Sequence, residues 1–112
     1  MELEHRVDDD ILVVRLVEKR LDARSVSSFR EKMNEFITAG YHRIALDISP
    51  IEFVDSSGLG ALVALLKRLS GQGDLVVCGA RETVMSMFKL TRLDKVFHMA
   101  TGVEGARAAL AK

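Results

Sequence analysis

Helical and strand-like apolar patterns alternate along this chain, and their order restricts the fold more than any other feature. Val26, Phe29 and Met33 recur at helical spacing, which predicts an amphipathic helix. Residues 11–17 and 43–49, on either side of this helix, are short apolar runs typical of strands. Because a helix separates these strands, we expect them to run parallel, joined by a right-handed crossover.

The remaining patterns extend the same order. Residues 3–7 and 11–17 flank the acidic turn 8–10 and predict an antiparallel hairpin. Further patterns predict a second helix along the apolar stripe 59–69, a strand at 75–80, a short helix around 84–88, an edge strand at 96–98 and a terminal helix at 103–110. We therefore expect an α/β fold: a small sandwich with a mixed, largely parallel sheet of four to five strands and about four helices, in a single domain spanning residues 1–112.

Local signals mark the ends of several elements. Asp22 or Ser25 is expected to cap the first helix, and Gly40 stands where a left-handed C-terminal cap would end it. Pro50 is expected to stop the strand 43–49. The acidic turn 8–10 is interpreted as a solvated turn rather than a cation site, because consecutive side chains point in different directions.

The charge balance argues against nucleic acid as a partner. The chain has 16 Lys and Arg and 16 Asp and Glu, so its formal net charge is zero. Proteins that bind duplex DNA usually carry a basic excess on one face, and single strands need aromatic stacking platforms. Aromatic residues make up only 5% of this chain, so we expect no direct contact with nucleic acid.

No pattern indicates membrane insertion or export. The apolar run 58–66 is too short to span a bilayer, and the acidic stretch 1–10 lacks the apolar segment of a signal peptide. The single cysteine, Cys78, cannot form an internal disulfide and is expected to be a small hydrophobe within a strand. We expect a cytoplasmic protein without a membrane partner.

The stretch 54–68, VDSSGLGALVALLKR, carries the most distinctive local signal. It joins the predicted strand 43–49 to the second helix, where backbone N–H groups and the positive end of the helix dipole converge. Asp55, Ser56 or Ser57 is expected to cap this helix, and Gly58 to allow close packing. A cap explains one of these side chains but not the clustering of two hydroxyls.

Two enzymatic interpretations of this stretch have weaker support. For nucleotide binding, a valine occupies the third glycine position of the dinucleotide fingerprint, and no G-x-x-x-x-G-K-[ST] motif occurs. For a serine nucleophile, the first glycine of the G-x-S-x-G elbow is missing. His5, His42 and His98 are expected at the surface or at strand edges, but a triad assembled in space stays open. A small nucleotide-binding or hydrolytic enzyme is therefore kept as an alternative.

The segment 44–68 resembles the signature of the STAS domain in its bacterial anti-sigma factor antagonist branch. The resemblance rests on the strand end Leu46-Asp47-Ile48, the aromatic Phe53 and the block 55–60, D-S-S-G-L-G, which is the most specific part. The order of the predicted elements also matches the family over nearly the whole chain. Asp22 takes the place of the acid before the first helix, whereas Lys19 departs from the glycine that relatives commonly have.

This resemblance implies a phosphorylation-switched interaction module rather than an enzyme, without a metal or cofactor of its own. Ser57, the second hydroxyl of the block, would be phosphorylated by a Ser/Thr kinase that is itself the anti-sigma factor, and a Ser/Thr phosphatase would reverse the modification. The unphosphorylated form would bind the anti-sigma factor and release the sigma factor. Partner contacts are expected at Asp22, Ser25, Asp55, Ser56, Gly58, Leu59 and Gly60. The alternative within the family is a STAS subunit of another assembly, such as a lipid-transport ATPase complex or a signalling scaffold.

Overall fold

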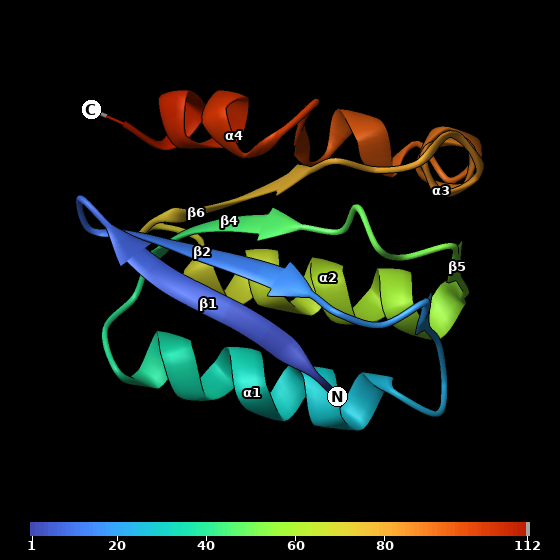
Figure 1. Ribbon diagram of the computed structural model, residues 1–112, viewed down its shortest axis with the longest axis horizontal. Helices are drawn as coiled ribbons and strands as arrows, with labels where there is room; N and C mark the ends of the chain where they lie inside the picture. The colour runs from blue at the N-terminus through green and yellow to red at the C-terminus, as the bar shows by residue number, and fades with distance from the viewer. Residues whose placement is uncertain (112) are drawn as a thin grey trace.

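A five-stranded sheet forms the centre of the computed structural model, which describes residues 1–111 (Figure 1). In spatial order its strands are β1 (Leu3–Asp8), β2 (Ile11–Leu16), β4 (Arg43–Asp47), β6 (Asp74–Cys78) and β7 (His98–Ala100). β1 pairs antiparallel with β2, and β2, β4, β6 and β7 pair in parallel. The predicted hairpin and the mixed, largely parallel sheet are confirmed.

Helices cover both faces of this sheet. α1 (Val26–Thr38) and α2 (Ser56–Leu69) lie on one face, and α4 (Val103–Leu110) lies on the other (Figure 1). α3 (Glu82–Leu90) contacts the short strand β5 (Phe53–Val54), and the 3-10 helix η1 (Leu93–Lys95) connects α3 to β7. The four α-helices and the α/β sandwich agree with the prediction.

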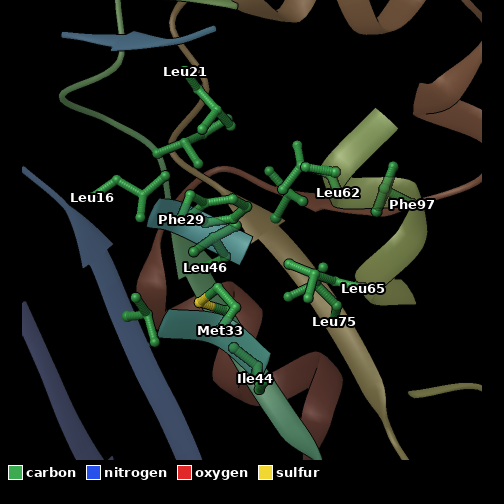
Figure 2. Close-up of a cluster of buried hydrophobic side chains, with 14 of the residues drawn as sticks. Leu16, Leu21, Phe29, Met33, Ile44, Leu46, Leu62, Leu65, Leu75 and Phe97 are labelled. Atoms are coloured by element: carbon green, nitrogen blue, oxygen red, sulfur yellow. The ribbon is translucent and has the colours of Figure 1, made fainter. Parts of the chain in front are cut away.

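Each face of the sheet has its own hydrophobic core. Along β2, Leu12, Val14 and Leu16 belong to the cluster that contains α1 and α2, whereas Ile11 and Val13 belong to the cluster that contains α4. This alternation follows from the two-residue period of a strand. Figure 2 shows the larger core, to which β2, β4, β6, α1 and α2 all contribute side chains. Burial on both faces explains why residues 75–78 of β6 are a continuous apolar run.

The structure differs from the sequence prediction at some strands. The predicted edge strand 96–98 is wrong in position, since β7 spans His98–Ala100 while Phe97 packs in the core against Phe88. β3 (Arg20–Leu21) and β5 form a separate two-stranded parallel sheet that the sequence patterns do not predict. Strands of two residues are too short to produce a periodic pattern.

The predicted end of α1 at Gly40 is confirmed. Gly40 has a φ of +108°, in the left-handed region that glycine adopts without a steric penalty. Its N–H donates to the carbonyl of Ile37, and the N–H of Tyr41 donates to that of Phe36. These two bonds are those of a Schellman motif, which satisfies the last carbonyls of the helix.

Cys78 lies in the core, as predicted. Its side chain is fully buried in β6, and this burial raises the pKa of the thiol to about 11. The thiol is therefore protonated at neutral pH and serves as a small apolar group. Across residues 1–111, every helix falls short of the length and apolarity that crossing a bilayer requires.

Candidate functional site

The start of α2 is fixed by the side chain of Asp55. Asp55 is the N-cap residue, and its Oδ1 accepts the N–H of Gly58 at 3.0 Å. This bond satisfies one of the N–H groups that the first turn leaves free, so the helix begins at Ser56. Of the three capping residues that the sequence offers, the structure uses Asp55.

The same carboxylate also holds a second segment of the chain. Oδ2 of Asp55 accepts the N–H of Ala23 at 3.2 Å, and the N–H of Asp55 donates to the carbonyl of Leu21 at 3.3 Å. Ala23 lies in the loop between β3 and α1, so Asp55 ties the entry to α1 to the entry to α2. The two segments predicted to contact a partner, one at 22–25 and one at 55–60, are therefore adjacent.

Asp22 organises the entry to α1. Its Oδ1 accepts the N–H of Arg24 at 3.1 Å, and its Oδ2 accepts from Nε of Arg20 at 3.0 Å. The bond from Arg20 is the main cause that lowers the pKa of this carboxyl, and the N–H of Arg24 acts in the same direction. Burial opposes the shift without reversing it. Asp22 is therefore ionised and held in place at neutral pH.

The cap of α1 differs from the prediction that Asp22 or Ser25 would supply a side chain. Ser25 occupies the N-cap position, but its hydroxyl makes no capping bond to the helix. Instead the hydroxyl accepts the N–H of Asp22 at 3.1 Å and lies 3.2 Å from the carbonyl of Arg20, to which it donates. The Asp22 carbonyl accepts the N–H of Val26 at 2.9 Å. Ser25 thus closes the loop, and the backbone of Asp22 begins the helix.

The residues after Asp55 divide into exposed and buried positions. Ser56, Ser57 and Gly60 are exposed, whereas Gly58 and Leu59 are buried. A Cβ at Gly58 would lie 2.4 Å from the Leu21 carbonyl oxygen, so only glycine fits there. Gly58 and Leu59 therefore support the turn from within, and the two serines and Gly60 face solvent.

Helical spacing places Ser57 on the same side of α2 as Arg68, which contacts α1. On α2, Ser57 shares one stripe with Ala61, Ala64 and Arg68, because residues four, seven and eleven apart fall on one side of a helix. Arg68 donates from its guanidinium to the side-chain hydroxyl of Thr38 in α1, at 2.9 Å. Ser57 lies on the same side of α2 as Arg68, at the opposite end of the helix and directly after Asp55.

An exposed aromatic beside this turn is missing from the predicted site residues. Phe53 is 42% exposed, and the guanidinium carbon of Arg20 lies 4.2 Å from the centre of its ring. The pair is a cation–π contact, and Arg20 is held from its other side by Asp22. The motif contains Phe53, but the sequence does not show that its ring stays outside the core.

Lys19, where glycine was expected, lies on the surface next to this pair. Its carbonyl accepts the N–H groups of Glu52 and Phe53 at 2.7 and 3.1 Å. These bonds attach the loop before β3 to the loop before β5, and they use only the backbone of Lys19. An open groove of about 480 Å³ runs along this loop, lined by Glu18, Lys19, Arg20, Asp22, Arg24 and Ser25.

Two features of the described residues concern the enzymatic alternatives. Between Met1 and Ala111, no group of three or more His, Cys, Asp or Glu side chains is placed to hold a metal ion. Within the same range no hydrogen bond joins a histidine to Ser56 or Ser57. The ionisable group described beside the two exposed hydroxyls is the Asp55 carboxylate, which is engaged in capping α2 and holding Ala23.

Comparison with known proteins identifies the family to which this chain belongs. The family model of the STAS domain matches residues 2–106. A candidate anti-sigma factor antagonist of Thermotoga maritima is 30% identical over 94 residues, which cover 82% of each chain. The anti-sigma-B factor antagonist of Staphylococcus epidermidis is 28% identical over 105 residues, covering 93% of this chain and 96% of the relative.

A solved structure shares the whole fold. The crystal structure of the Thermotoga maritima protein superposes with a TM-score of 0.88 at 26% identity, covering 98% of this chain and 95% of that one. The two chains therefore share one fold along nearly their whole length.

Proposed function

Because the chain belongs to the STAS domain family, we propose that it is an anti-sigma factor antagonist switched by phosphorylation of Ser57. In this proposal the unphosphorylated form binds an anti-sigma factor that is also a Ser/Thr kinase, and a Ser/Thr phosphatase restores that form. The chain itself is a cytoplasmic regulator and catalyses no reaction. The names of the two relatives support the antagonist function.

One observation carries the proposal: Ser57 is exposed at the second position of α2, while the neighbouring Asp55 caps the helix. The hydroxyl of Ser57 is therefore accessible to a kinase and is not needed to hold the turn. Gly60, one helical turn further, leaves open space above the surface, since a Cβ added there would meet no other atom within 4 Å. A kinase active site can approach the hydroxyl without displacing a side chain.

The fold is expected to tolerate a phosphate at this position. A phosphoserine carries about −1.5 to −2 charges at neutral pH. The dipole at the N-terminus of a helix stabilises such an anion by about 0.3–1 kcal/mol at an exposed site. The modification therefore leaves the folded state intact and changes only the surface.

A bound partner is expected to respond differently. In the bound state Ser57 would lie inside the interface, because it sits between the loop 22–25 and the exposed side of α2. Burying a dianion without a matched cation costs about 3 kcal/mol or more. Since about 1.4 kcal/mol changes an affinity tenfold, this cost reduces binding by about two orders of magnitude.

The proposed contact surface is narrower than the set of residues expected from the sequence. Ser56, Ser57 and Gly60 meet the partner directly, together with Asp22 and the exposed ring of Phe53. Gly58, Leu59 and Asp55 support this surface from below, and Ser25 closes the loop that carries Asp22. These roles follow from burial and hydrogen bonding, and they assign contact only to exposed groups.

The test uses the purified protein, Mg-ATP and the candidate anti-sigma kinases encoded in the same genome. We expect mass spectrometry to map one phosphate to Ser57, and calorimetry to show at least tenfold weaker binding of the phosphorylated form. Ser57→Ala should block phosphorylation and keep binding, whereas Ser56→Ala, the matched control, should leave both unchanged. Phosphate at another residue, or equal affinity of both forms, would contradict the switch.

The alternative role as a STAS subunit of another assembly predicts a different result. The protein would then form a complex with an ATPase or scaffold subunit whose stability does not change on Ser57→Asp. Titration of ATP and GTP against the protein alone tests the enzymatic alternative, for which we expect no binding.

A further inference from the structure

Two charged surfaces lie toward opposite ends of the longest axis of the molecule (Figure 1). The acidic tip consists of Val7, Asp8, Asp9 and Asp10 in the β1–β2 hairpin, and the basic corner consists of Lys89, Leu90, Arg92, Lys95 and Val96 at the end of α3 and around η1. The hairpin turn and α3 are separated along the longest dimension of the molecule, 31 Å (Figure 1). The basic corner lies at the same end of the molecule as β5 and the start of α2, and α3 contacts β5.

Both surfaces expose aliphatic side chains. Among residues 1–111 the large hydrophobic side chains that are exposed are Val7 at 51%, Leu90 at 80%, Val96 at 54% and Phe53 at 42%. Phe53 belongs to the proposed partner surface. The other three lie on the acidic tip and the basic corner, so each charged surface also offers an apolar contact.

Three charged residues at the two surfaces have a left-handed backbone conformation. Over residues 1–111, Asp9, Asp10 and Arg92 are the non-glycine residues with positive φ, at 51°, 66° and 61°. Glycine and asparagine are the residues best suited to this left-handed conformation, aspartate tolerates it, and arginine gains nothing there. Asp9 and Asp10 form the two-residue turn of the hairpin, where aspartate is common, so Arg92 alone occupies a position that favours another residue.

The charges of the basic corner lack intramolecular partners. Lys89, Arg92 and Lys95 form no ion pair with any residue between 1 and 111, and Asp94 is the acid nearest in sequence. The corner therefore carries a local excess of positive charge on a chain whose formal net charge is zero.

The charges of the acidic tip are only partly compensated. Arg107 lies 3.4 Å from Asp8 and 3.8 Å from Asp9, and Arg6 lies 3.8 Å from Asp8. The side chain of Asp9 is nevertheless 91% exposed, and Asp10 has no ion pair within the described range. Arg43 also contacts the tip, donating to the backbone carbonyl of Asp9 at 3.3 Å, so the carboxylates that remain turned outward are those of Asp9 and Asp10.

We propose that the acidic tip of one copy binds the basic corner of a second copy. Opposite charges meet around Arg92 and Asp9, and Val7 packs against Leu90 and Val96. Because the two surfaces differ, each bound copy still presents one free tip and one free corner, so the contact builds open head-to-tail chains rather than a closed dimer. A contact made by a few exposed side chains on each copy belongs to the weak, transient class.

Sedimentation velocity of the purified chain tests this proposal. At about 0.01 M salt, where charges interact over about 30 Å, we expect the weight-average sedimentation coefficient to rise with protein concentration. At about 1 M salt, where the range falls to about 3 Å, the rise should disappear. A wild-type protein that stays monomeric at millimolar concentration in low salt overturns the proposal. It does so even if the basic corner then proves to bind a different acidic protein.

Charge reversal makes the test specific. Arg92→Glu with Lys95→Glu, and separately Asp9→Lys with Asp10→Lys, should each abolish the association. An equimolar mixture of the two double variants should restore it, because each then offers the charge that the other lacks. Arg30→Glu with Lys32→Glu, which changes the net charge equally on α1, is the matched control and should associate like the wild type.

A second variant guards against unfolding of the hairpin. Asp9→Asn with Asp10→Asn removes the charge with a residue that suits positive φ, and should also abolish association while circular dichroism stays unchanged. Association that survives all three double substitutions would overturn the head-to-tail contact. Ser57→Asp should associate like the wild type, so this outcome is separable from the proposed phosphorylation switch.

Discussion

Asp55 and Ala23 are joined by a hydrogen bond of 3.2 Å that crosses from the start of one helix to the loop before another. The same Asp55 carboxylate caps α2 through Gly58. One side chain therefore sets both the beginning of a helix and the position of a neighbouring loop. The contacts proposed for a partner depend on this double role, because they come from both segments.

Asp55→Ser is expected to separate the two functions of this side chain. A serine at the N-cap can still accept the N–H of Gly58, but it has no second oxygen for Ala23. We expect Asp55→Ala to lower the free energy of unfolding by about 1 kcal/mol and Asp55→Ser by only a fraction of that. Amide hydrogen exchange at Ala23 should accelerate in both variants. Unchanged exchange at Ala23 would show that the bond does not hold the loop.

Gly58 and Gly60 form a natural pair for testing the packing of the turn. A Cβ at Gly58 would clash with the Leu21 carbonyl at 2.4 Å, whereas a Cβ at Gly60 meets no atom within 4 Å. We expect Gly58→Ala to destabilise the fold by about 1–3 kcal/mol. Gly60→Ala should stabilise it by about 0.5–1 kcal/mol, because alanine restricts the unfolded chain more than glycine does. Urea unfolding of both variants measures the difference, and equal effects would contradict the packing seen here.

Phe53 is expected to matter for binding rather than for folding. Its ring is 42% exposed and lies beneath Arg20, so truncation removes little buried surface. Phe53→Ala should weaken partner binding by about tenfold or more, since exposed aromatic side chains commonly dominate interfaces. The unfolding free energy should change by less than about 1 kcal/mol. Loss of stability without loss of affinity would place Phe53 in the fold instead.

Asp22 is expected to contribute to acid sensitivity. Its pKa is lowered in the folded state, mainly by the bond from Arg20, so folding favours the ionised carboxylate. The stability that this gives is present above the unfolded pKa of about 3.9 and is lost as the pH falls through the lower, folded pKa. Asp22→Asn should therefore flatten the decline of unfolding free energy below about pH 4. An unchanged pH profile in this variant would assign the acid sensitivity to other carboxylates.

Cys78 is expected to affect the stability of the fold at alkaline pH. Burial raises the pKa of its thiol to about 11 from 9.0, so folding favours the protonated form. The corresponding stability is fully present below pH 9.0 and is lost as the pH rises toward about 11. In the native protein the thiol should react slowly with a disulfide reagent until the chain unfolds. Rapid labelling at pH 8 without unfolding would contradict the burial of Cys78.

The sheet and the helices were predictable because their side chains repeat. In α1 the apolar side chains of Phe29 and Met33 recur at helical spacing, and in β6 residues 75–78 are all apolar. Both patterns can be read directly from a sequence. The order of these elements then permits few topologies. This regularity also placed Asp55 and the two serines at the start of a helix.

The sequence was less informative where a single contact decides the structure. The strands β3 and β5 span two residues each, which is too short for a periodic pattern to predict them. The bond from Ala23 to Asp55 joins residues 32 apart, and no local rule predicts such a pairing. The exposure of Phe53 depends on Arg20, which covers its ring only in the folded chain.

The cap at Asp55 has a consequence for how this turn can change during evolution. Folding relies on the aspartate and on Gly58, while the hydroxyl of Ser57 contributes no hydrogen bond to any residue between 1 and 111. Stability and signalling are thus divided between adjacent positions of one short motif. A substitution at Ser57 during evolution can therefore remove the phosphorylation site while the fold keeps its stability.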